Sequence, residues 1–180
     1  MKRVVFLGIV VSVCLVMIAG TQAGEKTKAD LIAEAESAAP AVIAKHATIK
    51  TADGTVLRKG TNDWTCYPGT KVIGPMCNQP EWDALLAALG NSGPFKPTTL
   101  SVSYMLAGEG EALGVSNSDP FATDPKHSHD WVKEGPHLMI IVPDPAMLEG
   151  LSTDPKDPVY VMWKGTPYAH IMVKVAEEKP

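Results

Sequence analysis

Residues 137–175, HLMIIVPDPAMLEGLSTDPKDPVYVMWKGTPYAHIMVKV, are the part of the chain that decides the fold. An apolar strand over 137–142 ends at a Pro-Asp-Pro sequence, whose aspartate can cap a short helix over 145–148. A second strand over 159–163 and a third over 168–175 flank a Lys-Gly-Thr-Pro turn, so these two strands can form a hairpin. Strands with so little helix between them favour an antiparallel sheet.

The chain before this region adds helices, a hairpin and another strand. Good helix formers over 29–38, with Asp30 placed to cap, and a Pro-Glu-Trp-Asp start with leucine spacing over 80–90 predict two helices. An Asp-Gly turn within 47–58 predicts a hairpin. A strand over 98–107 should have its apolar side at Leu100, Val102, Tyr104 and Leu106. We therefore expect a single α+β domain with a mainly antiparallel sheet, two or three helices and long Pro/Gly loops.

The N-terminus has the pattern of an export signal. A short basic start is followed by an apolar run over 4–19 and by small residues that allow cleavage before Gly24. The run is short for a membrane span, although an uncleaved anchor is the competing interpretation. We predict a signal peptide over 1–23 and a single exported domain over 24–180, periplasmic or secreted, that meets a membrane only through the signal segment before cleavage.

Composition and charge exclude two classes of protein. With 45% hydrophobic and 20% charged residues in 180, the chain is not of the disordered class. The 16 Lys and Arg against 20 Asp and Glu give a net charge of −4, which becomes −6 when Lys2 and Arg3 leave with the signal. No basic stripe is present, so we expect no nucleic-acid partner.

Cys66 and Cys77 are the cysteines that remain after the signal segment is removed. They lie close together in the sequence across a Pro/Gly-rich loop, which in an oxidising compartment predicts a disulfide. Trp64 and Tyr67 flank the first cysteine, and we expect these aromatic rings to pack against the disulfide. Two thiolate ligands to a metal are the alternative.

Two His-x-Met units are the sharpest candidates for a binding site. His137 and Met139 lie in the first strand of the quoted region, and His170 and Met172 lie in its closing strand. Residues i and i+2 of a strand share a face, so each unit presents an imidazole and a thioether together. Two such strands side by side would offer soft donors that suit Cu(I). Core packing is the alternative, because methionine fills β-cores readily and histidine at a strand end is often a structural hydrogen-bonded residue.

A second histidine pair lies in the long polar loop over 115–136. His127 and His129, with Asp130 beside them and His137 close in sequence, could hold zinc or copper. A metal site normally needs three or four protein ligands, and a solvated loop is the alternative.

Signatures of nucleophilic catalysis are missing, because the sequence contains no GxSxG, SxxK or HExxH motif. We assign no catalytic residue. The enzyme alternative is a small hydrolase in which His137 or His170 meets a carboxylate such as Asp130 or Asp144 within hydrogen-bond reach.

Four segments resemble a family of exported bacterial proteins of unknown function: DWTC at 63–66, DPFA at 119–122, GPHLMIIVPDP at 135–145 and MWKGTPYAHIM at 162–172. The likeness covers residues 47–175 and implies an envelope or secreted protein, with no activity and no site residue to carry over. In that family both cysteines have counterparts, whereas the His-Ser-His segment has none. We expect an exported binding or structural module of the cell envelope, with a soft-metal site for copper or zinc at the His-x-Met units, rather than an enzyme.

Overall fold

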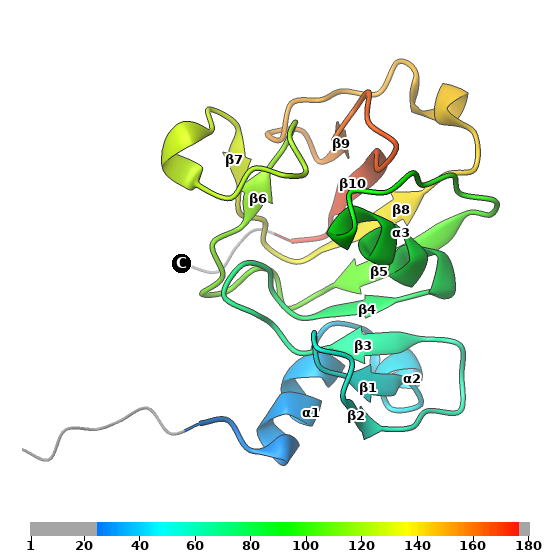
Figure 1. The fold of residues 1–180 in the computed structure, drawn as a ribbon, viewed down its shortest axis with the longest axis vertical. Helices are drawn as coiled ribbons and strands as arrows, with labels where there is room; N and C mark the ends of the chain where they lie inside the picture. Colours follow the sequence, from blue (N-terminus) through cyan, green and yellow to red (C-terminus); the bar gives the residue numbers. More distant parts are fainter. Residues whose placement is uncertain (1–24, 177–180) are drawn as a thin grey trace, which may run out of the picture.

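An eight-stranded sheet in the order β2-β1-β3-β4-β5-β8-β10-β9 forms the body of the computed structural model, which describes residues 25–176 (Figure 1). Its strands are β1 (Thr48–Lys50), β2 (Val56–Arg58), β3 (Thr65–Tyr67), β4 (Met76–Asn78), β5 (Ser101–Met105), β8 (His137–Ile141), β9 (Val159–Met162) and β10 (His170–Lys174). All neighbouring strands are antiparallel except β1 and β3. A separate pair is formed by β6 (Val115–Ser116) and β7 (Trp131–Val132). The α+β fold with a mainly antiparallel sheet, predicted from the sequence, is confirmed.

Three α-helices and two 3₁₀ helices lie within residues 25–176: α1 (Lys28–Glu36), α2 (Ala41–Ala44), α3 (Pro80–Gly90), η1 (Pro125–His127) and η2 (Pro145–Leu148). Thr27, not Asp30, is the N-cap of α1, and the Asp30 carboxylate accepts a hydrogen bond from the backbone N–H of Thr27 in a capping box. Asp144 caps η2 as predicted, because its carboxylate accepts from the backbone N–H of Ala146.

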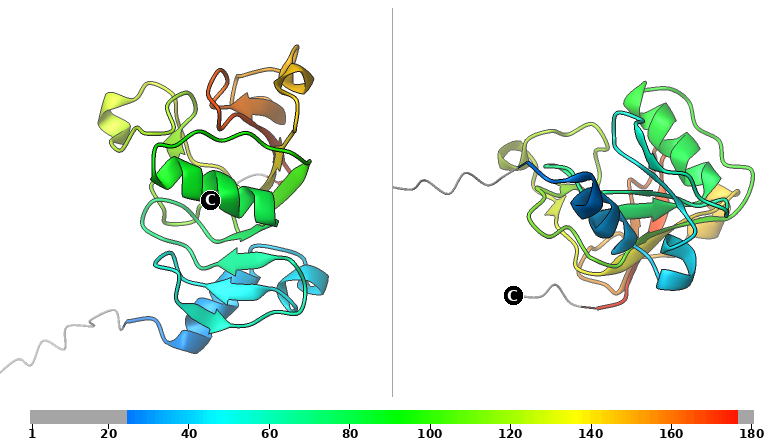
Figure 2. Two further views of the ribbon diagram at one scale, coloured as in Figure 1. Left: turned by 45° about the vertical axis from the view of Figure 1, so that its right-hand side comes forward. Right: turned by 90° about the horizontal axis from the view of Figure 1, so that it is seen from below.

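Helices cover both faces of the sheet. Helix α3 lies over β4 and β5, while α2 lies on the other side of the sheet (Figure 2). On the α3 side, Trp82 and Leu85 pack on the methionine-rich face of the central strands. On the other side, small residues of α1 and α2 let the helices approach Ile49 and the cysteines closely. The sheet is therefore buried on two sides, and its α3 face holds the larger core cluster.

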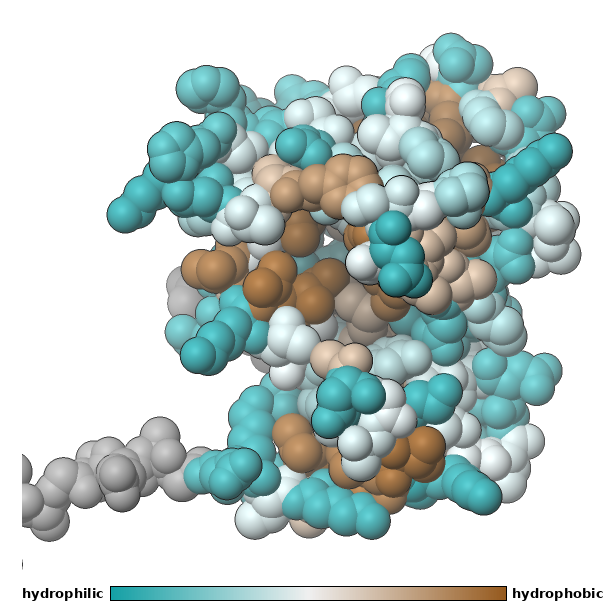
Figure 3. Space-filling view, viewed as in Figure 1, coloured by the Kyte–Doolittle hydropathy of each residue, from teal (hydrophilic) through white to brown (hydrophobic). Residues whose placement is uncertain are grey.

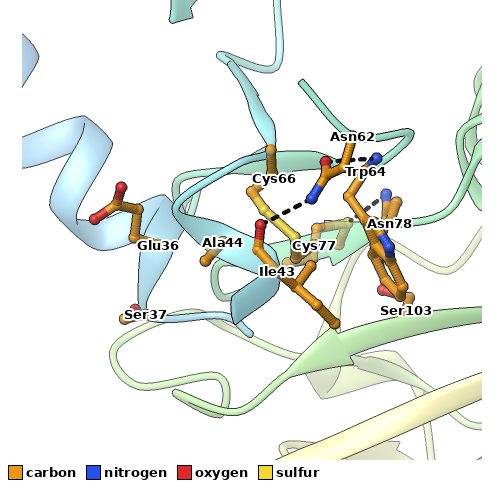
Figure 4. Close-up of a disulfide and its surroundings, with 12 residues drawn as sticks. Glu36, Ser37, Ile43, Ala44, Asn62, Trp64, Cys66, Cys77, Asn78 and Ser103 are labelled. Carbon is orange, nitrogen blue, oxygen red and sulfur yellow. Dashed lines mark hydrogen bonds between the residues drawn. A yellow bond between two sulfur atoms is a disulfide. The ribbon is translucent and has the colours of Figure 1, made fainter. Parts of the chain in front are cut away.

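The predicted disulfide between Cys66 and Cys77 is present (Figure 4). The two cysteines are opposite one another in β3 and β4, and both are fully buried. Trp64 packs beside them, with its ring 5.5 Å from that of Tyr104, whereas Tyr67 packs on the α3 face. The expectation of two flanking aromatic rings therefore holds for one of them, because successive residues of a strand point to opposite faces. A buried disulfide is consistent with an extracytoplasmic protein.

The predicted signal peptide over 1–23 lies outside the described residues. Between residues 25 and 176, no helix is long and apolar enough to cross a membrane.

Candidate soft-metal site

The four residues of the two His-x-Met units lie on one face of the sheet. Strands β8 and β10 are neighbours, and their register pairs Met139 directly with Met172. His137 and His170 precede these methionines by two positions, so all four side chains point to the α3 face. Each residue is at most 5% exposed. The copper interpretation requires adjacent strands with the same face exposed to a cleft. The strands are adjacent and the four side chains share a face, but that face is buried.

These four residues line one small cavity of about 40 Å³. Three further methionines contribute to its wall, and sequence reasoning missed them: Met76, Met105 and Met162. The walls are otherwise mainly apolar, with Trp82 and Trp163 on either side of His170, each ring centroid 5.0 Å from the imidazole centroid. The cavity therefore gathers two imidazoles and five thioethers from the described residues into one buried space.

Both imidazoles are oriented in the same way by the backbone. Nδ1–H of His170 donates to the carbonyl of Tyr168 at 3.0 Å, and Nδ1–H of His137 donates to the carbonyl of Gly135 at 2.8 Å. This tautomer leaves the lone pair on Nε2. In His170, Nε2 is buried and has no hydrogen-bond partner in the part of the chain that the structure describes. A histidine whose other ring nitrogen is held by a backbone carbonyl is the usual arrangement of a metal ligand.

The imidazoles are neutral at neutral pH. Burial lowers the pKa of His170 to about 4, and the nearby His137 ring adds to this effect. Burial also lowers the pKa of His137, although its hydrogen bond to Gly135 and the charge of Glu134 act in the opposite direction. Because a metal ligand must be deprotonated, both rings are ready to bind without first losing a proton.

The register separates the two imidazoles. Ile171 is paired with Ile140, so His170 lies beside Ile141, four positions along β8 from His137. Four residues of antiparallel strand span roughly 14 Å. Each imidazole therefore has its own set of neighbours on the sheet.

Each imidazole has two methionines among its neighbours on the sheet, and Lys174 of β10 is also paired with His137. The first triad is His137, Met139 two positions further along β8, and Met105, which is paired with His137 across β5. The second triad is His170, Met172 and Met162, which is paired with His170 across β9. Directly opposite side chains have Cβ atoms about 5 Å apart, so a soft ion above each pair can be reached by one nitrogen and two sulfur atoms.

Two buried carboxylates border the cavity, and both are already engaged. Glu134 accepts a hydrogen bond from the Tyr160 hydroxyl at 2.9 Å and forms an ion pair with Lys174 at 3.3 Å. Glu109 accepts from the backbone N–H of Gly74 at 2.6 Å. The Nδ1 atoms of both histidines bond to backbone carbonyls.

The histidine–carboxylate pair that a hydrolase would need is not formed by Asp130 or Asp144. Asp130 accepts hydrogen bonds from the hydroxyl groups of Ser116 and Ser128, and Asp144 caps η2 in an exposed position. Neither aspartate lines the cavity with His137 or His170.

The His-Ser-His segment does not assemble a metal site. His127 is exposed and pairs with Asp124 at 2.7 Å, and His129 is also exposed. Over residues 25–176, no group of three or more His, Cys, Asp or Glu side chains could hold a metal ion. The donors gathered in the structure are instead imidazole and thioether groups.

No family model, curated protein or solved structure that we compared matches this chain. The interpretation of the site therefore rests on its own chemistry.

Proposed function

We propose that this is an exported, non-enzymatic metal-binding protein that takes Cu(I) in the cavity of His137, Met139, His170 and Met172. The observation that carries the proposal is the unpartnered, buried Nε2 of His170 in a cavity lined by methionine sulfur atoms. An unsatisfied buried nitrogen in a native fold needs an explanation, and a bound ion supplies one.

The donor set favours Cu(I) over harder ions. Thioether sulfur is a soft ligand that selects Cu(I), whereas Zn²⁺ and Cu²⁺ are commonly held by sets rich in imidazole, thiolate or carboxylate. Because the imidazoles are neutral and the two bordering carboxylates are already engaged, the low single charge of Cu(I) is the least costly to bury. Zinc is therefore the weaker of the two metals considered from the sequence.

The two triads indicate a stoichiometry of two copper ions per chain. We propose one ion at His137, Met105 and Met139, and a second at His170, Met162 and Met172. The pairs Met105–His137 and Met162–His170, each directly opposite across neighbouring strands, support this division.

The proposed location is the periplasm or the outside of the cell. The signal-peptide pattern, the resemblance to exported bacterial proteins and the buried Cys66–Cys77 disulfide all support it. In such a compartment the protein would sequester or carry copper.

Anaerobic titration with Cu(I) against a competing chromogenic chelator tests this function. The parent protein should bind two ions, and His170→Phe should bind one, since the phenyl ring keeps the packing but supplies no nitrogen. Met162→Leu should weaken the binding of the same ion. Met147→Leu is the control, because Met147 is exposed and lies outside the cavity. No binding by the parent, or two ions in every variant, would contradict the proposal.

A further inference from the structure

A second, larger hollow opens beside the metal cavity. It has a volume of about 660 Å³ and is bounded by α3, by the segment after β3 and by the loop before η1. Figure 3 shows apolar side chains around a hollow next to α3 on this face. Met76, Leu86 and Trp163 line both spaces, so the groove and the cavity share a wall.

The groove has the size and the walls of a site for an organic molecule. Ligand pockets usually measure about 300–1,000 Å³ and combine apolar walls with few polar groups. Here the walls are mainly hydrocarbon and aromatic, with Phe121 half-exposed at the rim and Trp163 in the depth. Phe121 packs edge to face against the buried Tyr168, with the two ring centroids 5.8 Å apart.

One carboxylate stands in this apolar surface. Asp83, in the first turn of α3, is the only Asp, Glu, Lys, Arg or His among the described residues that line the groove. Its Oδ1 accepts a hydrogen bond from Nδ2 of Asn78 at 3.1 Å, and the hydroxyl groups of Tyr67 and Thr65 also hydrogen-bond to this carboxylate. Burial raises the pKa of Asp83 in spite of these hydrogen bonds and of the nearby Lys50 charge. The surroundings therefore do not fully compensate the buried negative charge.

We propose that this groove binds a hydrophobic organic cation, an amine or quaternary ammonium with an apolar body. The charge complementarity comes from Asp83, and Tyr67 lines the groove beside this carboxylate. The body of the ligand would lie against Leu86 and Leu89 of α3 and against Phe121. This site needs no metal and does not depend on the proposed copper binding.

Calorimetric titration of the metal-free protein, purified from the exported fraction of a bacterial host, tests the inference. The probes are benzyltrimethylammonium and its neutral isostere neopentylbenzene, which differ only in the charged atom. The parent should bind the cation at least about tenfold more tightly, as expected for a partly buried charged contact. Asp83→Asn should remove this preference, whereas Asp63→Asn, at an exposed position outside the groove, should keep it.

A second pair of variants tests the place of binding. Ala87→Phe fills the groove from an exposed position of α3, and Ala84→Phe places the same ring on an exposed position of α3 outside it. Only the first should weaken the binding of both probes. The inference is overturned if the parent binds neither probe, if it binds both equally, or if cation binding survives Asp83→Asn. Copper binding by the same preparation is a separate measurement, and its result does not depend on whether the groove binds the organic cation.

Discussion

The metal-free protein should lose stability as the pH falls through the range in which His170 takes up a proton. Burial lowers the pKa of this imidazole from 6.5 to about 4. As the pH falls below 6.5, the imidazole takes up a proton in the unfolded chain before it does so in the folded protein, so the unfolded state is stabilised relative to the folded state. The stabilising contribution is therefore fully present above pH 6.5 and is lost as the pH falls through the folded pKa.

The size of the effect follows from the shift. One pKa unit corresponds to 1.36 kcal/mol, so His170 accounts for a loss of about 3 kcal/mol once the pH is below both pKa values. About 2 kcal/mol of this loss should already be present at pH 5. His137, whose pKa is lowered by burial as well, adds to the loss in the same direction.

Urea unfolding at intervals from pH 8 to pH 4.5 measures this loss. His170→Phe keeps an aromatic ring beside Trp82 and Trp163 but cannot titrate. Between pH 8 and pH 5 its free energy of unfolding should therefore fall by about 2 kcal/mol less than that of the parent. His129→Ala, a change at an exposed loop position, is the control and should follow the parent. Equal slopes for the parent and His170→Phe would refute the assignment of a buried, neutral imidazole.

Two further predictions concern the frame that holds the site. Replacement of both Cys66 and Cys77 by alanine should lower the free energy of unfolding by about 3 kcal/mol, because the disulfide restricts the unfolded chain by closing a loop between residues 11 positions apart. Thermal unfolding of the two forms measures this loss. Gly74→Ala would place a Cβ 2.2 Å from the carbonyl oxygen of Gly108, so it should lower the free energy of unfolding measured in urea by about 2 kcal/mol. Gly90 has open space around it, so Gly90→Ala should not lower the free energy of unfolding. An unchanged Gly74→Ala protein would mean that these two segments are not in close contact.

Local elements could be predicted from the sequence because their signals are local. Helix α3 begins at Pro80 and ends at Gly90, where the proline, the acidic first turn and the glycine had placed it. The hairpin of β1 and β2 turns at Gly54, which has a φ of 87° that glycine adopts at no steric cost. The hairpin of β9 and β10 is also confirmed.

The alternation of β5 does not tell which of its sides is the more buried. Val102 and Tyr104 share one side of the strand, as predicted, but Ser101, Ser103 and Met105 on the other side are the more buried residues. The reason is that the sheet is covered on both faces, so alternation does not distinguish inside from outside. The Ser103 hydroxyl is satisfied there by a hydrogen bond to Oδ1 of Asn78 at 2.6 Å.

Half of the candidate site could be predicted and half could not. The period of two within a strand placed His137 with Met139 and His170 with Met172. Which strands lie next to β8 and β10 is decided by non-local pairing, and for this reason Met105 and Met162 were missed. The cysteines were expected beside a loop and in fact lie in two paired strands, since strands of three residues carry almost no periodic signal.

X-ray absorption at the copper edge of the Cu(I)-loaded protein is the most direct test of the central claim, that imidazole and thioether side chains of β5, β8, β9 and β10 bind a soft metal. The account predicts two copper ions per chain, each with about one nitrogen and two sulfur neighbours, as expected for His-Met₂ triads. The loss of one such ion in His170→Phe would assign the second triad. A copper environment of nitrogen and oxygen alone, or a protein that retains no copper, would contradict it.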